Sequence, residues 1–256
     1  MSGEAGSARS GVRPAVSRSI TTSSDELAKD RARALALIPV SRETLDRLDR
    51  YVALLLDWQR RLNLIAPSTE PTLWTRHVAD SLQLLSLAPG AHVWADLGSG
   101  AGFPGMPIAC ALAEAQGARV HLVESSAKKA AFLYEAVRAT GAPAAVHAMR
   151  IADFVKAPPA RMQVVTARAV APLCNLLTEA YPLLKSGAIG LFPKGQGVDA
   201  ELTEAAKYWR LQVTLVPSRT DPRARIVVIS GLEPLAGRDA AKARRSGEHS
   251  KTGLRR

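Results

Sequence analysis

A glycine-rich stretch between an apolar run and an alanine-rich segment constrains the fold of this 256-residue chain more than any other feature. The stretch reads Asp96-Leu97-Gly98-Ser99-Gly100-Ala101-Gly102-Phe103-Pro104-Gly105. The apolar run before it, residues 92–95, is typical of a buried parallel strand, and residues 106–115 favour a helix that begins near Pro107. Because glycine carries no Cβ, a strand–turn–helix unit of this kind lets the backbone approach a nucleotide-like ligand closely.

Strand and helix patterns alternate after this unit. Strands are expected over 92–97, 119–124, 144–149, 162–167, 187–193, 211–216 and 225–230, with helices near 106–115, 126–140, 172–184 and 198–209. The alternation through residue 193 predicts an α/β fold whose seven-stranded, mostly parallel sheet is covered on both faces. A turn with Pro217 and Asp221-Pro222 precedes the last strand, which favours an antiparallel hairpin at the sheet edge.

The chain is expected to divide into four segments. Residues 1–40 are predicted to be a disordered extension, since Ser, Gly, Ala and Arg dominate the start of the chain without apolar periodicity. Residues 41–90 are predicted to be helical, with an amphipathic helix that opens at Ser41 and a second helix over 71–87. Residues 91–231 form the α/β domain, and residues 232–256 are expected to be a basic, disordered tail.

The net charge of +11 lies mostly in the two ends of the chain, because residues 1–33 carry +2 and residues 234–256 carry +5. An anionic partner is compatible with this distribution but does not follow from it. Cys110 and Cys174 lie far apart, which suits a reducing cytoplasm, and the five histidines have no metal-ligand spacing. We therefore expect a cytoplasmic protein without a metal and without a membrane span.

Glu124 ends the second strand of the expected sheet, where a carboxylate can accept two hydrogen bonds from a ribose diol. The glycines before it match two motifs. Gly100-x-Gly102-x-x-Gly105 fits the dinucleotide fingerprint and would imply an NAD-dependent oxidoreductase. Asp96-x-Gly98-x-Gly100-x-Gly102 fits the first motif of S-adenosylmethionine methyltransferases.

The full turn, residues 96–107, resembles the motif of the glucose-inhibited division protein B family, the small-subunit ribosomal RNA methyltransferases G. The resemblance continues at the ends of the other elements, from about residue 41 to 231. Its further motifs are Arg76-His77-x-x-Asp80-Ser81, Glu124-Ser125 with Lys128-Lys129, Arg150, Ala167-Arg168-Ala169, and Lys194-Gly195-Gln196. Six ordered motifs are far more specific than one glycine turn.

This resemblance implies a Rossmann-like class I methyltransferase that moves the methyl group of S-adenosylmethionine to N7 of one guanine in 16S rRNA. Carried over residue by residue, it implies cofactor contacts at the positions Asp96, Gly98, Gly100, Phe103, Glu124, Ile151, Ala152 and Arg168. Glu124 would hold the ribose, and Ile151-Ala152 would lie beside the adenine. Many relatives carry a glutamate in place of Ala152, so that contact would come from backbone. Asp96 either orders the glycine turn or contacts the amino-acid end of the cofactor.

The expected RNA-facing residues are Arg150, Arg168, Lys194 and His77. Arg168 is a candidate for RNA or cofactor contact, because a guanidinium binds phosphate or carboxylate through paired donors. His77 and Asp80 are spaced by three residues, which predicts a hydrogen-bonded pair that caps the site rather than a catalytic one. The two lysines at 128–129 stand near a helix start, where cations are disfavoured, and this favours a role in anion binding.

Guanine N7 has a lone pair and no proton, so its methylation requires no general base. Catalysis would then depend on orientation and on exclusion of water, which agrees with the lack of a recognisable acid–base dyad in the sequence. The expected partner is 16S rRNA or the small ribosomal subunit, and the expected state is a monomer. A non-catalytic RNA-binding module is a third interpretation.

Overall fold

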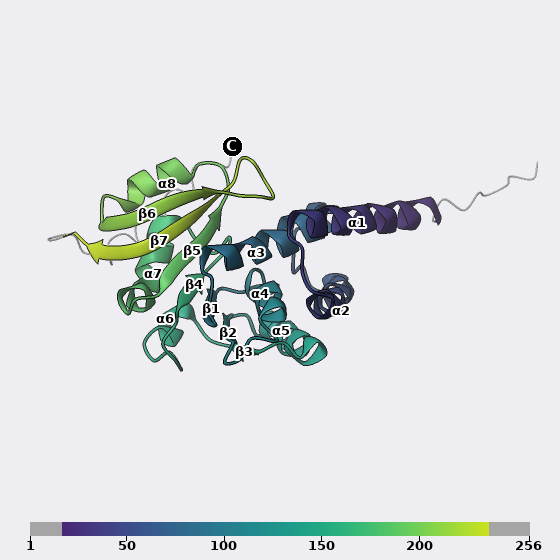
Figure 1. The fold of residues 1–256 in the computed structure, drawn as a ribbon, viewed down its shortest axis with the longest axis horizontal. Coiled ribbons are helices and arrows are strands. Elements are labelled where there is room, and N and C mark those ends of the chain that lie inside the picture. The colour runs from purple at the N-terminus through teal and green to yellow at the C-terminus, as the bar shows by residue number, and fades with distance from the viewer. Residues whose placement is uncertain (1–16, 236–256) are drawn as a thin grey trace, which may run out of the picture.

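The computed structural model describes residues 17–235, with side chains from residue 25 onward, and its centre is a seven-stranded sheet (Figure 1). The strands are β1 (Val93–Leu97), β2 (Arg119–Val123), β3 (Ala144–His147), β4 (Val164–Thr166), β5 (Ile189–Lys194), β6 (Trp209–Pro217) and β7 (Arg225–Pro234). Their order is β3-β2-β1-β4-β5-β7-β6. The first five strands pair in parallel, and β7 is antiparallel to both β5 and β6. The predicted sheet and its edge hairpin are confirmed.

Alternating side chains of the strands build two separate cores. Trp94 of β1 packs with α4 (Gly105–Ala111), α5 (Ala127–Thr140) and α2 (Arg42–Gln59) on one face. Its neighbour Ala95 packs on the other face with α6 (Ile151–Phe154), α7 (Leu173–Lys185) and α8 (Val198–Ala205). The sequence did not predict α6, and it placed the ends of the helices at 115 and 209 too late. Both faces of the sheet are therefore covered, as in a doubly wound fold.

Helix α2 forms where the sequence predicts it. The Ser41 hydroxyl caps the helix by accepting a hydrogen bond from the Thr44 backbone N–H at 3.2 Å. The second expected helix forms as a helical segment of mixed type: the 3₁₀ helix η1 (Pro67–Thr72), the π-helical η2 (Trp74–Ala79), α3 (Asp80–Leu82) and the 3₁₀ helix η3 (Gln83–Leu87). A π turn inside a helical segment often marks a functional position.

The predicted disorder of residues 1–40 is wrong for residues 17–37, which form the helix α1 (Ser17–Leu37). Tertiary contacts rather than local periodicity hold this helix. The Asp30 carboxylate is buried and accepts hydrogen bonds from the Thr75 backbone N–H at 2.9 Å and from the Thr75 hydroxyl. The Arg31 guanidinium donates a bidentate pair of hydrogen bonds to the Asp49 carboxylate of α2, at 2.8 and 2.6 Å. Residues 1–16 and 236–256, also predicted to be disordered, lie outside the described residues, and 232–234 belong to β7.

Replacement of Asp30 tests whether α1 is part of the folded unit. We expect Asp30→Ala to lower the free energy of unfolding by about 1–3 kcal/mol, because the Thr75 N–H loses its partner in a partly buried position. Asp25→Ala, an exposed position on the same helix, is the matched control. Urea denaturation measures both, and equal stability of the two variants would contradict the prediction.

Candidate active site

A cavity of about 1310 Å³ opens at the carboxyl ends of the parallel strands. Its walls come from the turns after the five parallel strands, from helix α1 and the η1–η2 segment, and from the turn between β6 and β7. Of the residues predicted for the site, the cavity is lined by His77, Gly98, Gly100, Phe103, Glu124, Ile151, Arg168 and Lys194. The topology of a parallel sheet thus brings together residues that are far apart in the sequence.

The glycine turn after β1 requires glycine for two different reasons. Gly98 has φ +70° and Gly100 has φ +57°, a region that residues with side chains rarely adopt. A Cβ on Gly98 would also lie 2.6 Å from the side chain of Val170. The N–H groups of Gly98 and Ser99 both donate to the carbonyl of Val123, which fixes the turn against the end of β2.

Asp96 lies behind this turn and not in the cavity. Its side chain is completely buried, and Oδ2 accepts a hydrogen bond from the Gly105 N–H at 3.1 Å. Burial raises the pKa of Asp96 to about 7. A Cβ on Gly105 would come within 2.8 Å of Asp96 Oδ2, so only glycine leaves room for the carboxyl group at this distance. Of the two roles expected for Asp96, the geometry supports the ordering of the turn.

Glu124 connects the glycine turn with the loop after β2. Its Oε2 accepts a hydrogen bond from the Gly100 N–H at 2.9 Å, and its Oε1 accepts one from the Ser126 N–H at 2.7 Å. The carboxylate is nearly buried but lines the cavity. Each oxygen of a carboxylate accepts more than one hydrogen bond, so both can still receive a donor from a ligand.

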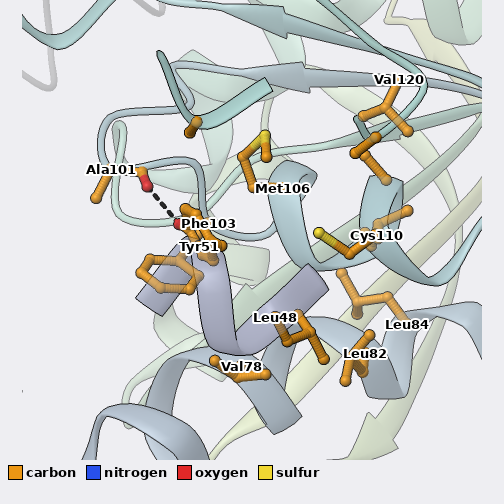
Figure 2. Close-up of a cluster of buried hydrophobic side chains, with 14 of the residues drawn as sticks. Leu48, Tyr51, Val78, Leu82, Leu84, Ala101, Phe103, Met106, Cys110 and Val120 are labelled. Carbon is orange, nitrogen blue, oxygen red and sulfur yellow. Dashed lines mark hydrogen bonds between the residues drawn. The ribbon is translucent and has the colours of Figure 1, made fainter. Parts of the chain in front are cut away.

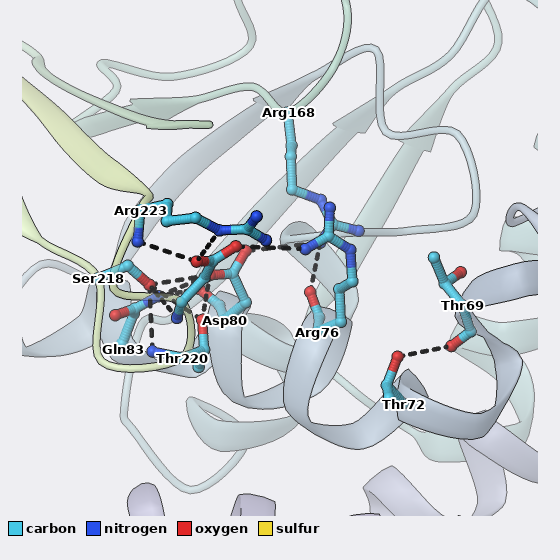
Figure 3. Close-up of polar contacts among 10 residues, drawn as sticks. Thr69, Thr72, Arg76, Asp80, Gln83, Arg168, Ser218, Thr220 and Arg223 are labelled. Carbon is cyan, nitrogen blue, oxygen red and sulfur yellow. Dashed lines mark hydrogen bonds and ion pairs between the residues drawn. The ribbon is translucent and has the colours of Figure 1, made fainter. Parts of the chain in front are cut away.

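Arg168, which follows β4, is the centre of a polar cluster in the cavity wall (Figure 3). Its guanidinium donates to Nδ1 of His77 at 2.6 Å and to the Arg76 carbonyl at 3.1 Å. It also forms an ion pair with Asp80 at 3.6 Å. The guanidinium carbon lies 5.1 Å from the centre of the Phe103 ring, and the same ring stacks on His77 at 4.9 Å. Arg168 therefore joins the turn after β4 to η2 and to the glycine turn.

The cluster keeps His77 neutral. Burial, together with the positive charges of Arg168 and Arg76, lowers the pKa of His77 to about 3. Since Nδ1 accepts from Arg168, the ring proton is on Nε2, which lies 3.0 Å from the Thr69 hydroxyl. The predicted direct bond between His77 and Asp80 is wrong, because Arg168 stands between them and contacts both.

Asp80 extends the cluster to the turn between β6 and β7. Its Oδ1 accepts hydrogen bonds from the Gln83 amide at 2.8 Å and from the Thr220 hydroxyl at 2.7 Å, and the Ser218 hydroxyl lies at 3.5 Å (Figure 3). No local pattern predicts this contact, because Thr220 follows Asp80 by 140 residues. One carboxylate thus fixes the far rim of the cavity.

Helix α2 packs against the glycine turn through Tyr51. The buried Tyr51 hydroxyl donates a hydrogen bond to the carbonyl of Ala101, and the Tyr51 ring packs edge-on against Phe103 at 5.5 Å (Figure 2). Burial raises the pKa of Tyr51 well above its ordinary value, so the hydroxyl keeps its proton. The helical segment before the sheet is therefore part of the site.

Lys194 and Arg150 differ in whether their charged groups are paired with other side chains. Lys194 was expected to face RNA, but its Nζ donates to Glu201 at 2.8 Å and to the Ala171 carbonyl at 3.1 Å, and only 12% of its side chain is exposed. Arg150 precedes α6, is exposed, and makes no side-chain hydrogen bond or ion pair among residues 25–235. It lines a smaller pocket together with Ile151 and Ala152.

Two further expectations concern lysines and metals. Lys129 lines the large cavity, whereas Lys128 is exposed and does not line it. Within the part of the chain that the structure describes, no three His, Cys, Asp or Glu side chains gather in a way that could hold a metal ion. None of the helices in that part has the length and apolar character needed to cross a bilayer.

The family model described as rRNA small subunit methyltransferase G matches residues 44–226. This chain belongs to that family. It is 61% identical over 209 residues to a ribosomal RNA small subunit methyltransferase G of Bradyrhizobium sp. (strain ORS 278). This alignment covers 82% of this chain and 94% of that protein. A protein of the same name from Nitrobacter hamburgensis is 60% identical over 80% of this chain and 79% of its own length.

Solved structures agree with the fold. A putative O-methyltransferase from Klebsiella pneumoniae superposes with a TM-score of 0.52 at 11% identity, covering 82% of this chain and 99% of the other. An O-methyltransferase from Bacillus cereus gives a TM-score of 0.50 at 14% identity over 82% of this chain and all of the other. At such low identity these similarities concern the fold, and they confirm the class I methyltransferase architecture.

The neutral His77 makes stability depend on pH. In the unfolded chain the imidazole binds a proton below about pH 6.5, whereas in the folded protein it does so only near pH 3. The unfolded state therefore gains protons first on acidification, and stability falls as the pH drops from about 6.5 toward 3. His77→Asn keeps an acceptor for Arg168 but does not titrate. Between roughly pH 6.5 and 4.5, the free energy of unfolding of the wild type should fall by up to about 1.4 kcal/mol more per pH unit than that of the variant. Urea denaturation at each pH measures this. Parallel pH profiles would contradict this.

Proposed function

We propose that this protein transfers the methyl group of S-adenosylmethionine to N7 of a guanine in 16S rRNA of the small ribosomal subunit. The observation that carries the proposal is the Glu124 carboxylate, held beside the glycine turn at the rim of the large cavity, in a chain that belongs to this methyltransferase family. The choice of N7 and of 16S rRNA rests on the family.

The residues around Glu124 suit the nucleoside part of the cofactor. The two oxygens of Glu124 would accept hydrogen bonds from the ribose hydroxyls, and the backbone at Gly98 and Gly100 leaves room that a Cβ would take. Ile151 and Ala152, which line the smaller pocket adjoining the cavity, would lie beside the adenine. The cofactor supplies a methyl group on a sulfonium, which is electrophilic without further activation.

The side chains of the cavity position the reactants and do not need to move a proton. N7 of guanine carries a free electron pair and no hydrogen, so the reaction requires no general base. The neutral ring of His77 has both nitrogens engaged, one by Arg168 and the other by Thr69. The stacked rings of His77 and Phe103, with Arg168 over the latter, form a rigid wall that orients a base and excludes water.

The substrate side of the proposal concerns RNA. Arg150 and Lys129 would contact RNA phosphates. Arg168 and Lys194 form ion pairs inside the cavity wall and would touch RNA only with the atoms they expose.

We further propose that the protein acts as a monomer in the cytoplasm, where its substrate is made. An NAD-dependent oxidoreductase would bind NAD, and a non-catalytic RNA-binding module would bind RNA without methylating it.

Removal of the Glu124 carboxylate should weaken cofactor binding. We expect Glu124→Ala to raise the Kd of S-adenosylmethionine by about 10- to 100-fold, because hydrogen bonds to a charged group are lost and the Gly100 N–H is freed. Isothermal titration calorimetry measures this, and Glu233→Ala, which removes an exposed carboxylate on β7, is the control. Titration of the wild type with NAD in the same instrument should give no heat of binding. Unchanged cofactor affinity in Glu124→Ala would contradict the proposal.

Methyl transfer itself is tested with rRNA from cells that lack this protein. Incubation of their small subunits, or of the naked rRNA, with the wild type and labelled S-adenosylmethionine should yield N7-methylguanosine at one position, found by mass spectrometry of the digested RNA. Cofactor binding without any methylated product would indicate a different substrate. Binding of RNA but not of the cofactor would support the non-catalytic module.

A further inference from the structure

Helix α1 lies outside the region matched by the family model, which begins at residue 44, yet it forms part of the cavity wall. Asp30 and Arg33 of α1 line the cavity, as do Thr72 of η1 and Thr75 and Arg76 of η2. Helix α1 packs against η1 and η2, and in Figure 1 α3 lies between this helix and the sheet. The cavity is therefore built in part by an element that precedes the residues matched by the family model.

The attachment of α1 is specific. Asp30 is buried and receives two hydrogen bonds from Thr75, which precedes His77 by two residues. Arg31 pairs with Asp49 of α2, and its guanidinium lies 5.3 Å from the centre of the Trp74 ring. These contacts fix both the position and the rotation of α1, so that Arg33 stands at a defined place on the wall.

The cavity is larger than the cofactor requires. Pockets that enclose a molecule of that size measure roughly 300–1,000 Å³, and this cavity measures about 1310 Å³. The cofactor is assigned to the end formed by the strand termini, around Glu124. The other end, formed by α1, η1 and η2, is left for the RNA substrate.

Charge at this second end favours a phosphate. Arg33 is exposed, and its guanidinium has no ion pair or hydrogen bond within residues 25–235. The nearest acid along its helix, Asp30, is already occupied by Thr75. Arg76 is 57% exposed and meets Asp221 only at 3.7 Å. Two arginines with unused donors on one wall match the oxygens of a nucleic-acid backbone.

We propose that α1 forms the substrate end of the cavity and that Arg33 binds a phosphate of the RNA next to the methylated guanosine. This inference rests on the proposed function and adds a positioning residue to it. Arg33 would help to hold the RNA so that the target base reaches the stacked rings of His77 and Phe103, without any contact to the cofactor.

The test compares Arg33→Gln with Arg210→Gln in methyl transfer to rRNA lacking the modification. Arg210, 76% exposed near the start of the edge strand β6, loses the same charge and does not line the cavity. For Arg33→Gln we expect a KM for RNA about 5- to 10-fold higher, and a slope of log affinity against log salt that is smaller by about 0.7–0.9, the loss of one phosphate contact. The Kd of S-adenosylmethionine and the free energy of unfolding should stay unchanged. Arg33→Lys should recover most of the RNA affinity.

Three results would overturn the inference. The first is a KM and salt slope in Arg33→Gln equal to those of Arg210→Gln. The second is a loss of cofactor binding or of stability in Arg33→Gln that matches the loss of RNA affinity, because Arg33 would then act on the fold. The third is an Arg33→Lys variant as weak as Arg33→Gln. Failure of the proposed function is distinct, since the wild type itself would then produce no methylated rRNA.

Discussion

The buried charge of Arg168 is the interaction on which the cavity wall depends. Burial lowers the pKa of this guanidinium, and the nearby Asp80 carboxylate opposes that shift. A buried cation is tolerated only when its donors are satisfied, and Arg168 finds its acceptors on His77 and on the Arg76 carbonyl. Since those acceptors belong to η2, the turn after β4 and the irregular helical segment must assemble together. The π-helical η2 presents a backbone carbonyl and an imidazole to the same guanidinium.

The sequence predicted the sheet and the position of the glycine turn and Glu124 at its edge because both depend on local patterns. The glycine turn and Glu124 stand directly after strands, so the alternation of strands and helices was enough to place them at one edge. The same argument placed Arg168 and Lys194 at that edge. It could not show that Lys194 is neutralised by Glu201, because an ion pair across two elements has no periodicity to detect.

The errors concern contacts between distant parts of the chain. Helix α1 looked disordered because its start is polar, and its stability comes from Asp30 binding a residue 45 positions later. The His77–Asp80 pair was expected from spacing alone, whereas a side chain more than 80 residues away stands between them. In each case the deciding partner is a polar group made available by the tertiary fold, and a short-range pattern carries no record of it.

The double hydrogen bonding of Glu124 has a consequence for the thermodynamics of ligand capture. Two backbone N–H groups, from Gly100 and Ser126, already hold its carboxylate in one orientation. A sugar diol that arrives there would meet acceptors that are set in advance, and little rotamer entropy would be given up when the complex forms. The affinity gained from this carboxylate should then be mainly enthalpic, with fast association that needs no rearrangement of the loop.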